Sequence, residues 1–186
     1  MSNEVKKQAS CADASDPFAL TVQQARDIIR RTLVPIRDEE LVPIRSALGR
    51  VLANDCISPI NVPSHTNSAM DGYALAGADL PQEGFRNYRV IAKAFAGRRL
   101  AEVCEAGQCV RIMTGAPMPQ GTDTVIMQEQ VEKLGDARVR VDSRHRVGQN
   151  VRQAGEDIAQ GSVVLKAGRV LAAADLGVLA SLGFSE

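Results

Sequence analysis

Residues 63–74 hold the side chains best suited to site chemistry in this sequence. Asp71 supplies a carboxylate that can bind a hard cation such as magnesium, or accept a hydrogen bond from a substrate. Asn67 and Ser68 supply neutral donors that can orient an oxyanion. The Asp71-Gly72 pair is also common in tight turns, because both residues tolerate positive φ. The segment therefore predicts either a site or a turn in which the aspartate bonds its own backbone.

A second polar segment follows at residues 111–117. Thr114 offers a hydroxyl group, and Gly115 lets a ligand approach the backbone amides closely, so this loop could hold an anion. Arg111 either adds positive charge to that site or lies on the exposed face of a strand. The Gly-Lys-Ser/Thr ending of the phosphate loops of nucleotide hydrolases is missing. A turn at the end of a strand remains the alternative.

The third segment places Glu156 and Asp157 side by side after Gly155. Two adjacent acids can share work on a metal or a substrate, but they are also common in solvated turns. Arg152, just upstream, could hold one of them in an ordinary surface ion pair. Site and turn both remain open for this segment.

Composition excludes several function classes. The 186 residues contain 22 Lys and Arg against 22 Asp and Glu, so no net charge favours nucleic acid or an anionic membrane. No apolar run approaches the roughly 20 residues that span a bilayer. Residues 1–18 are expected to form a disordered leader without the apolar region of a signal peptide. We therefore expect a cytoplasmic protein.

Cysteine and histidine spacing does not favour a zinc site. The two histidines, His65 and His145, are expected in surface or loop positions rather than as ligands. We expect the cysteines to be free thiols in a reducing compartment. The four cysteines are scattered: Cys11, Cys56, Cys104 and Cys109.

Helices are expected near both ends of the sequence. Thr21 and Gln24 have capping-box spacing at the start of a helix that ends before Pro35. A second helix is expected from Ser46, and a last one carries an apolar face up to a stop at Gly183.

The middle of the sequence favours strands. Short apolar runs there are separated by turns that contain glycine and proline. The clearest runs are residues 89–92, 109–113, 124–127 and 138–141. The order predicts an α+β fold, in which a discontinuous α+β domain (residues 19–62 and 150–186) carries an inserted β-rich, barrel-like domain (residues 63–149). One continuous α+β domain is the alternative.

Five ordered blocks of the sequence resemble the N-terminal region of the MoeA-type molybdopterin molybdenumtransferases, the family that includes the E domain of gephyrin. They are residues 49–53, 67–74, 110–117, 125–129 and 152–158, and the ending at 180–183 is also similar. Five blocks in order are far more specific than any one of them.

The resemblance implies a late step of molybdenum cofactor synthesis. Molybdate is inserted into adenylylated molybdopterin with release of AMP, and magnesium assists. Catalytic roles are implied for Asp71, Thr114 and Asp157, with Asp71 as the metal ligand. Substrate contacts are implied for four further residues: Asn67, Ser68, Gly115 and Glu156. The implied partners are the two substrates, a second copy of the chain in a homodimer, and other proteins of cofactor synthesis, with no nucleic acid and no membrane.

The family also continues beyond the matching region. Its members carry a molybdopterin-binding domain and a C-terminal β domain that this sequence lacks. The chain is therefore expected to be the N-terminal part of such an enzyme and inactive by itself. A scaffold or dimerisation module without catalysis is the alternative function.

Overall fold

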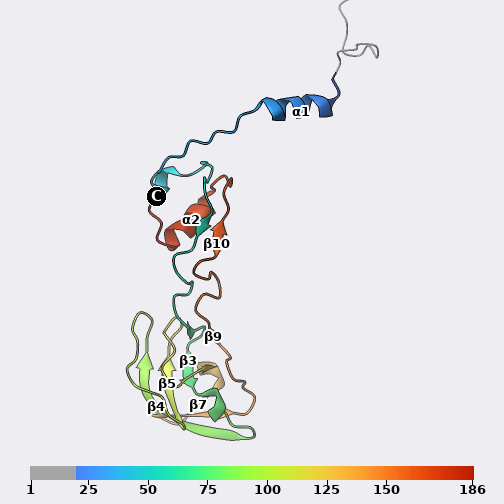
Figure 1. The fold of residues 1–186 in the computed structure, drawn as a ribbon. Coiled ribbons are helices and arrows are strands. Elements are labelled where there is room, and N and C mark those ends of the chain that lie inside the picture. The colour runs from blue at the N-terminus through green and yellow to red at the C-terminus, as the bar shows by residue number, and fades with distance from the viewer. Residues whose placement is uncertain (1–19) are drawn as a thin grey trace, which may run out of the picture. The chain divides into compact units, whose positions relative to one another are not determined.

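The structure, a computed structural model, describes residues 20–186 (Figure 1). It divides into two units, one that ends at Glu40 and one that comprises Leu41–Glu186. The expected leader and Cys11 lie outside the described residues.

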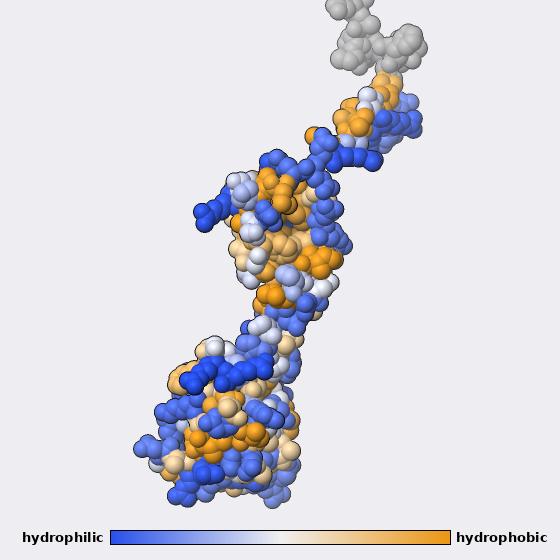
Figure 2. All heavy atoms as spheres, turned by 60° about the vertical axis from the view of Figure 1, so that its left-hand side comes forward, coloured by the Kyte–Doolittle hydropathy of each residue, from blue (hydrophilic) through white to orange (hydrophobic). Residues whose placement is uncertain are grey.

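The first unit contains the helix α1, Val22–Thr32. The Thr21 hydroxyl accepts a hydrogen bond from the backbone N–H of Gln24, and the Gln24 side chain accepts one from the backbone N–H of Thr21. The predicted helix and its capping box are thus confirmed. No residue of α1 is buried, and Figure 2 shows apolar atoms at its surface.

The second unit is built around a curled sheet with the strand order β6-β3-β5-β4-β8-β7. Strands β4 and β5 are parallel, whereas the other neighbours are antiparallel. The four strands predicted from the sequence are confirmed within it. The bounds are β3 Gly72–Leu75, β4 Phe85–Ala94, β5 Gln108–Ile112, β6 Thr124–Met127, β7 Glu132–Lys133 and β8 Arg138–Asp142.

Both faces of this sheet are covered. Successive residues of a strand point to opposite faces, and here they belong to different apolar clusters. Tyr73 and Leu75 pack in one cluster, while Ala74 between them packs in the other. Cys109 and Val110 divide in the same way. The central strands are therefore anchored from two sides, which fixes the strand ends where the polar segments begin.

Smaller pairings join segments that are distant in the sequence. Strand β1, Cys56–Ile57, pairs with β10, Val163–Leu165, and β2, Asn67–Ser68, pairs with β9, Val151–Arg152. Isolated bridges join Val51 to Val170 and Val62 to Ile158. These pairings give a mixed α+β fold. The division into a discontinuous domain and an inserted domain stays a prediction.

Helix α2, Ala173–Ser181, confirms the expected C-terminal helix, and Gly183 follows it at φ +89°. The helix expected from Ser46 is wrong. Only the 3₁₀ turn η1, Ile44–Ser46, forms there, and the chain then turns through Gly49. The backbone beyond it bonds residues 169–171 instead, so long-range pairing overrides the local helical pattern.

Two further 3₁₀ turns, η2 Gly77–Asp79 and η3 Gln128–Gln130, complete the described elements. Cys56, Cys104 and Cys109 are free and buried, as predicted. Within residues 20–186, no helix is both long enough and apolar enough to cross a membrane.

Candidate functional site

The structure joins two of the predicted site residues directly. Oδ1 of Asp71 accepts a hydrogen bond from the backbone N–H of Thr114 at 2.8 Å and another from the Thr114 hydroxyl at 2.7 Å. Asp71 precedes β3, and Thr114 follows β5, the neighbouring antiparallel strand. The pairing of Gly72 with Ile112 brings the two loops together. For residues 63–74 the sequence allowed either a site or a turn in which Asp71 bonds its own backbone. In the structure, Asp71 instead bonds Thr114 in a distant loop.

These two hydrogen bonds favour the ionised form of Asp71. Donation by the Thr114 backbone and then by its hydroxyl holds the pKa of Asp71 below its usual value, and the charge of Arg111 adds to the effect. Both bonds reach the same oxygen. Among residues 20–186, no hydrogen bond reaches Oδ2 of Asp71. The site thus presents one anionic oxygen with capacity for a ligand.

Strand β2 links this pair to the third polar segment. Asn67 lies opposite Arg152 of β9 on one side and forms a bridge with Pro117 on the other. The backbone of Ser68 bonds Gly115 and Ala116. All three segments singled out in the sequence therefore meet at β2.

The amides of the second segment all have partners within the protein. Thr114 N–H bonds Asp71, Gly115 N–H bonds the Ser68 carbonyl at 2.8 Å, and Ala116 N–H bonds the Met113 carbonyl at 3.0 Å. These amides are therefore not free to hold an anion, which favours the turn at the end of a strand over the anion site that the sequence left open beside it. A substrate contact by Gly115 stays a prediction, without support from a free backbone amide.

Ser68 and Asn67 lie inside the protein. The Ser68 side chain donates to the carbonyl of Met70 at 2.5 Å, and only 1% of the residue is exposed. Asn67 is 7% exposed and donates to the carbonyl of His65 at 3.3 Å. The Ser68 hydroxyl, which was predicted to orient an oxyanion, therefore donates within its own loop, because a buried donor needs a partner inside the protein.

The third segment is a charged turn. Arg152 donates through Nε to Glu156 and through Nη2 to Asp157, each at 2.5 Å. The second Glu156 oxygen accepts from the Gln153 amide at 2.8 Å. The side-chain hydrogen bond of Arg152 and then the Gln153 amide hold the pKa of Glu156 below its usual value. Arg152 therefore pairs with both acids, where the surface interpretation expected one.

No described contact joins Asp157 to Asp71 or Thr114, so the structure brings two of the three predicted catalytic residues together. Within residues 20–186, no group of three or more histidine, cysteine, aspartate or glutamate side chains could hold a metal ion.

Gln128 is an addition that the sequence did not assign, whereas Arg111 was left open there between the site and a strand face. Nη1 of Arg111 donates to the carbonyl of Gly72 at 2.8 Å, and Nη2 donates to Oε1 of Gln128. The backbone N–H of Gln128 bonds the carbonyl of Asp71 at 3.1 Å. Gln128 lies in one of the five resembling blocks, and that was the only sequence signal for it.

The described residues match the family described as the MoeA N-terminal region (domain I and II) from residue 20 to residue 183. The chain belongs to the MoeA N-terminal family.

Curated relatives of this MoeA N-terminal chain agree with that membership. It is 44% identical over 167 residues to the molybdopterin molybdenumtransferase of Haemophilus influenzae, which covers 90% of this chain and 41% of the relative. It is 34% identical to gephyrin of Dictyostelium discoideum, over 87% of this chain and 24% of that protein. The MoeA N-terminal chain thus spans less than half the length of these relatives.

Solved structures agree as well. A crystal structure of the molybdopterin biosynthesis MoeA protein of Pyrococcus horikoshii OT3 superposes with a TM-score of 0.75 at 36% identity, covering 81% of this chain and 40% of the other. Sequence and fold therefore point to the same MoeA region.

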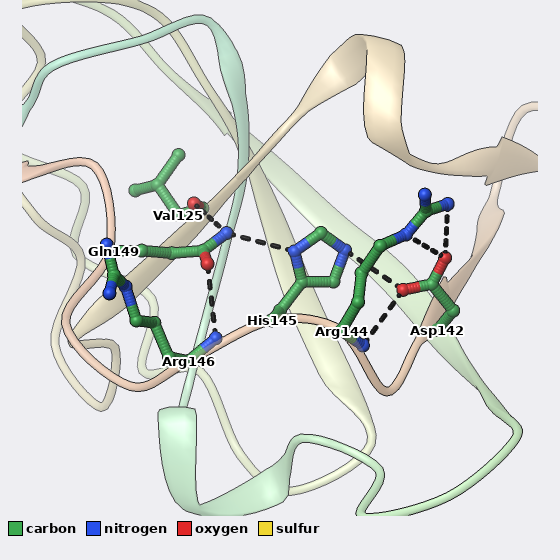
Figure 3. Close-up of polar contacts among 6 residues, drawn as sticks. All are labelled: Val125, Asp142, Arg144, His145, Arg146 and Gln149. Carbon is green, nitrogen blue, oxygen red and sulfur yellow. Dashed lines mark hydrogen bonds and ion pairs between the residues drawn. The ribbon is translucent and has the colours of Figure 1, made fainter.

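A separate polar cluster of the MoeA N-terminal chain lies in the loop after β8 (Figure 3). His145 lies in a loop, one of the two positions expected for it, but it is not at the surface, because only 3% of its side chain is exposed. Gln149 donates to Nδ1 at 3.1 Å, which leaves the proton of the neutral ring on Nε2. Nε2 lies 3.5 Å from Asp142, too far for a good hydrogen bond.

Burial lowers the pKa of His145, and the nearby charge of Asp142 opposes that effect. Asp142 is itself bound by Arg144, whose side-chain hydrogen bond lowers the pKa of the carboxyl group. The backbone N–H of Val125 donates to the carbonyl of Gln149, and this hydrogen bond ties the loop to β6. The cluster therefore closes this loop onto the sheet.

Proposed function

We propose that this chain supplies the N-terminal part of a molybdopterin molybdenumtransferase site, which inserts molybdate into adenylylated molybdopterin and releases AMP. The observation that carries the proposal is the Asp71 carboxylate, held ionised through one oxygen by Thr114 and open at the other. Membership of the MoeA N-terminal family and the names of the relatives support the reaction.

The donor chemistry at Asp71 fits magnesium. Mg²⁺ is commonly bound by one or two carboxylates, with waters and substrate phosphates completing its six oxygens. A single ionised oxygen on a fixed carboxylate meets that need, and Asp71 is the residue that would hold the ion. When bound, magnesium would neutralise charge that develops on the phosphate and molybdate oxygens.

The chain's own residues divide the remaining work. Thr114 orients Asp71, and its hydroxyl proton is committed to Oδ1, so it acts on the substrate through Asp71. The Ser68 side chain keeps the loop between β2 and β3 in place through its hydrogen bond to Met70. Asp157, whose Oδ2 is bound by Arg152, is proposed as a supporting acid. Asn67, Gly115 and Glu156 are proposed to shape the substrate side of the loops.

A homodimer and a cytoplasmic location are further parts of the proposal. Helix α1 supports the homodimer, because its apolar residues Val22 and Ile29, seven positions apart on one helix face, are 74% and 57% exposed. Apolar side chains at helical spacing usually pack against a partner. Contacts with other proteins of molybdenum cofactor synthesis are proposed because the chain belongs to the MoeA N-terminal family.

A chimera tests the proposed function. Residues 20–183 replace the matching region of the Haemophilus influenzae molybdopterin molybdenumtransferase, and molybdate insertion into adenylylated molybdopterin is measured. We expect the chimera to be active and its Asp71→Ala variant to be inactive. The intact relative and the 186-residue chain alone are measured beside it. A folded but inactive chimera, or an active Asp71→Ala variant, would refute the proposal.

A further inference from the structure

Arg111 lies where the two loops of the Asp71–Thr114 pair leave the sheet. It belongs to β5, opposite Tyr73 of β3, and its guanidinium carbon lies 5.2 Å from the centre of the Tyr73 ring. Tyr73 is only 5% exposed, so the ring is a fixed support for the planar guanidinium. The side chain therefore reaches toward the start of β3 in a defined direction.

The guanidinium holds the two consecutive peptide groups that follow Asp71, one directly and one through Gln128, without a hydrogen bond to its carboxylate. Nη1 donates to the carbonyl of Gly72, the residue after Asp71, at 2.8 Å. Nη2 donates to Gln128, whose backbone N–H in turn bonds the Asp71 carbonyl at 3.1 Å. Arg111 thus connects the carbonyl of Gly72 with the residue that binds the carbonyl of Asp71.

Gly72 makes this connection possible. A Cβ atom built at Gly72 would lie 2.1 Å from the carbonyl oxygen of Ile126 on β6. Since only glycine lets β3 and β6 approach so closely, the Gly72 carbonyl and Gln128 stay within reach of one guanidinium.

Arg111 also differs from arginines that pair with a carboxylate. Such ion pairs are formed, among others, by Arg86, Arg140, Arg144, Arg152 and Arg169. The bonds of Arg111 go to carbonyl and amide oxygens instead. A neutral oxygen needs no arginine as counter-charge, so the forked shape of the group accounts for its presence better than its charge does.

We propose that Arg111 is a positioning residue of the transferase site, which fixes the Asp71 carboxylate against Thr114 by holding Gly72 and Gln128 together. This inference rests on the proposed function for its effect on rate, but the positioning itself is a property of this chain. Arg111 would not contact the substrate.

Two variants and one control test the proposal. Arg111→Lys keeps a charge but loses the fork, Arg111→Met loses both, and Arg140→Met removes an arginine of β8 that pairs with Glu132. In the 186-residue chain, the amide proton of Thr114 is followed by NMR, because its hydrogen bond to Asp71 sets its chemical shift and its exchange with solvent. Both Arg111 variants are expected to shift this signal and speed its exchange, and the Arg140 variant is not.

In the chimera, both Arg111 variants are expected to lower kcat by about tenfold or more and to change KM less than about twofold, as for the loss of an outer partner of a ligand. An unchanged Thr114 signal in a folded Arg111→Lys variant would overturn the proposal. A rise in KM with unchanged kcat would also overturn it, because it would mean direct substrate contact. A shifted Thr114 signal in a chain whose wild-type chimera is inactive would refute the proposed function and leave the positioning intact.

Discussion

The Asp71 loop and the Arg152 turn both expose carboxylates, and both lie beside β2, but different partners hold their acids. Asp71 is held by two neutral donors of Thr114, which bind one oxygen and leave its negative charge in place. Glu156 is held by Arg152 and by the Gln153 amide, which together bind both of its oxygens. Arg152 also binds Asp157, so its one positive charge serves two acids.

A carboxylate that serves as a ligand needs partners that leave its negative charge in place. Neutral donors lower the pKa without cancelling the charge, so the group remains attractive to a cation. An arginine fork lowers the pKa as well, but it offers the acid a cation that competes with any ligand. Adjacent acids in a sequence therefore indicate a site less well than a single acid with neutral partners.

The largest expected effect is on the rate of molybdate insertion, which should differ between variants of the Asp71 loop and variants of the Arg152 turn. In the chimera, Asp71→Asn is expected to lower the rate of molybdate insertion by about 100-fold or more, because loss of a ligand should exceed the 10–100-fold typical for its outer partners. Glu156→Gln is the comparison in the other loop, and because Arg152 already pairs with that charge, it should lower the rate less, by about threefold. Equal losses in the two variants would remove the distinction between the loops.

The next effect concerns the partner that holds Asp71. Thr114→Val removes the hydroxyl donor but keeps the backbone donor, and should lower the rate by about 10–100-fold. Thr114→Ser should restore most of the activity. Thr122→Val is the control, since that hydroxyl also donates within a turn, to the carbonyl of Pro119. Full activity in Thr114→Val would show that the hydroxyl does not orient Asp71.

A smaller effect is expected in the stability of the Arg152 turn. Arg152→Met breaks ion pairs whose side chains are 36–52% exposed. Such pairs stabilise little, so Tm measured by calorimetry should fall by about 2–4 °C at most. A much larger fall in Tm would mean that the ion pairs of the turn stabilise the β2–β9 pairing.

The smallest effect is a response to salt. The pKa of Glu156 is lowered first by the side chain of Arg152, whereas that of Asp71 is lowered first by the Thr114 amide. At about 1 M salt the Debye length falls to about 3 Å, which weakens the attraction between exposed charged groups whose charges are farther apart than that. The carboxyl pKa of Glu156, followed by ¹³C NMR, should therefore rise more than that of Asp71. The opposite order would indicate that charge, and not hydrogen bonding, holds Asp71.

Acid should affect the two loops in the same direction. Both carboxylates have a pKa below the usual value when folded. Each therefore contributes stability above its ordinary pKa, near 4, and that stability is lost as the pH falls through the folded value.

Local patterns in the sequence predicted the elements that depend on near neighbours. The Thr21–Gln24 capping box and the stop at Gly183 are local, and both are confirmed. Val139 and Val141 alternate with charged residues and are both buried. By contrast, the helix from Ser46 was wrong, because pairing with residues more than a hundred positions away decides that segment.

The site was predicted less completely, for the same physical reason. Residue types indicated Asp71 and Thr114, but only strand register brings them into contact. Burial of Ser68 and His145 depends on the packing of distant segments, and neither residue carries a sequence signal for it. The role of Arg111 was left open between site and strand face until its partners Gly72 and Gln128 were known.

The most direct test is to locate the cation ligand in this chain with Mn²⁺, which prefers the same oxygen ligands as Mg²⁺ and broadens nearby NMR signals. If Asp71 holds the ion, the amide signals of Gly72 and Thr114 should broaden before those of residues 153–157, and Asp71→Asn should abolish the effect. Broadening centred on Glu156 and Asp157, or unchanged broadening in Asp71→Asn, would contradict the account.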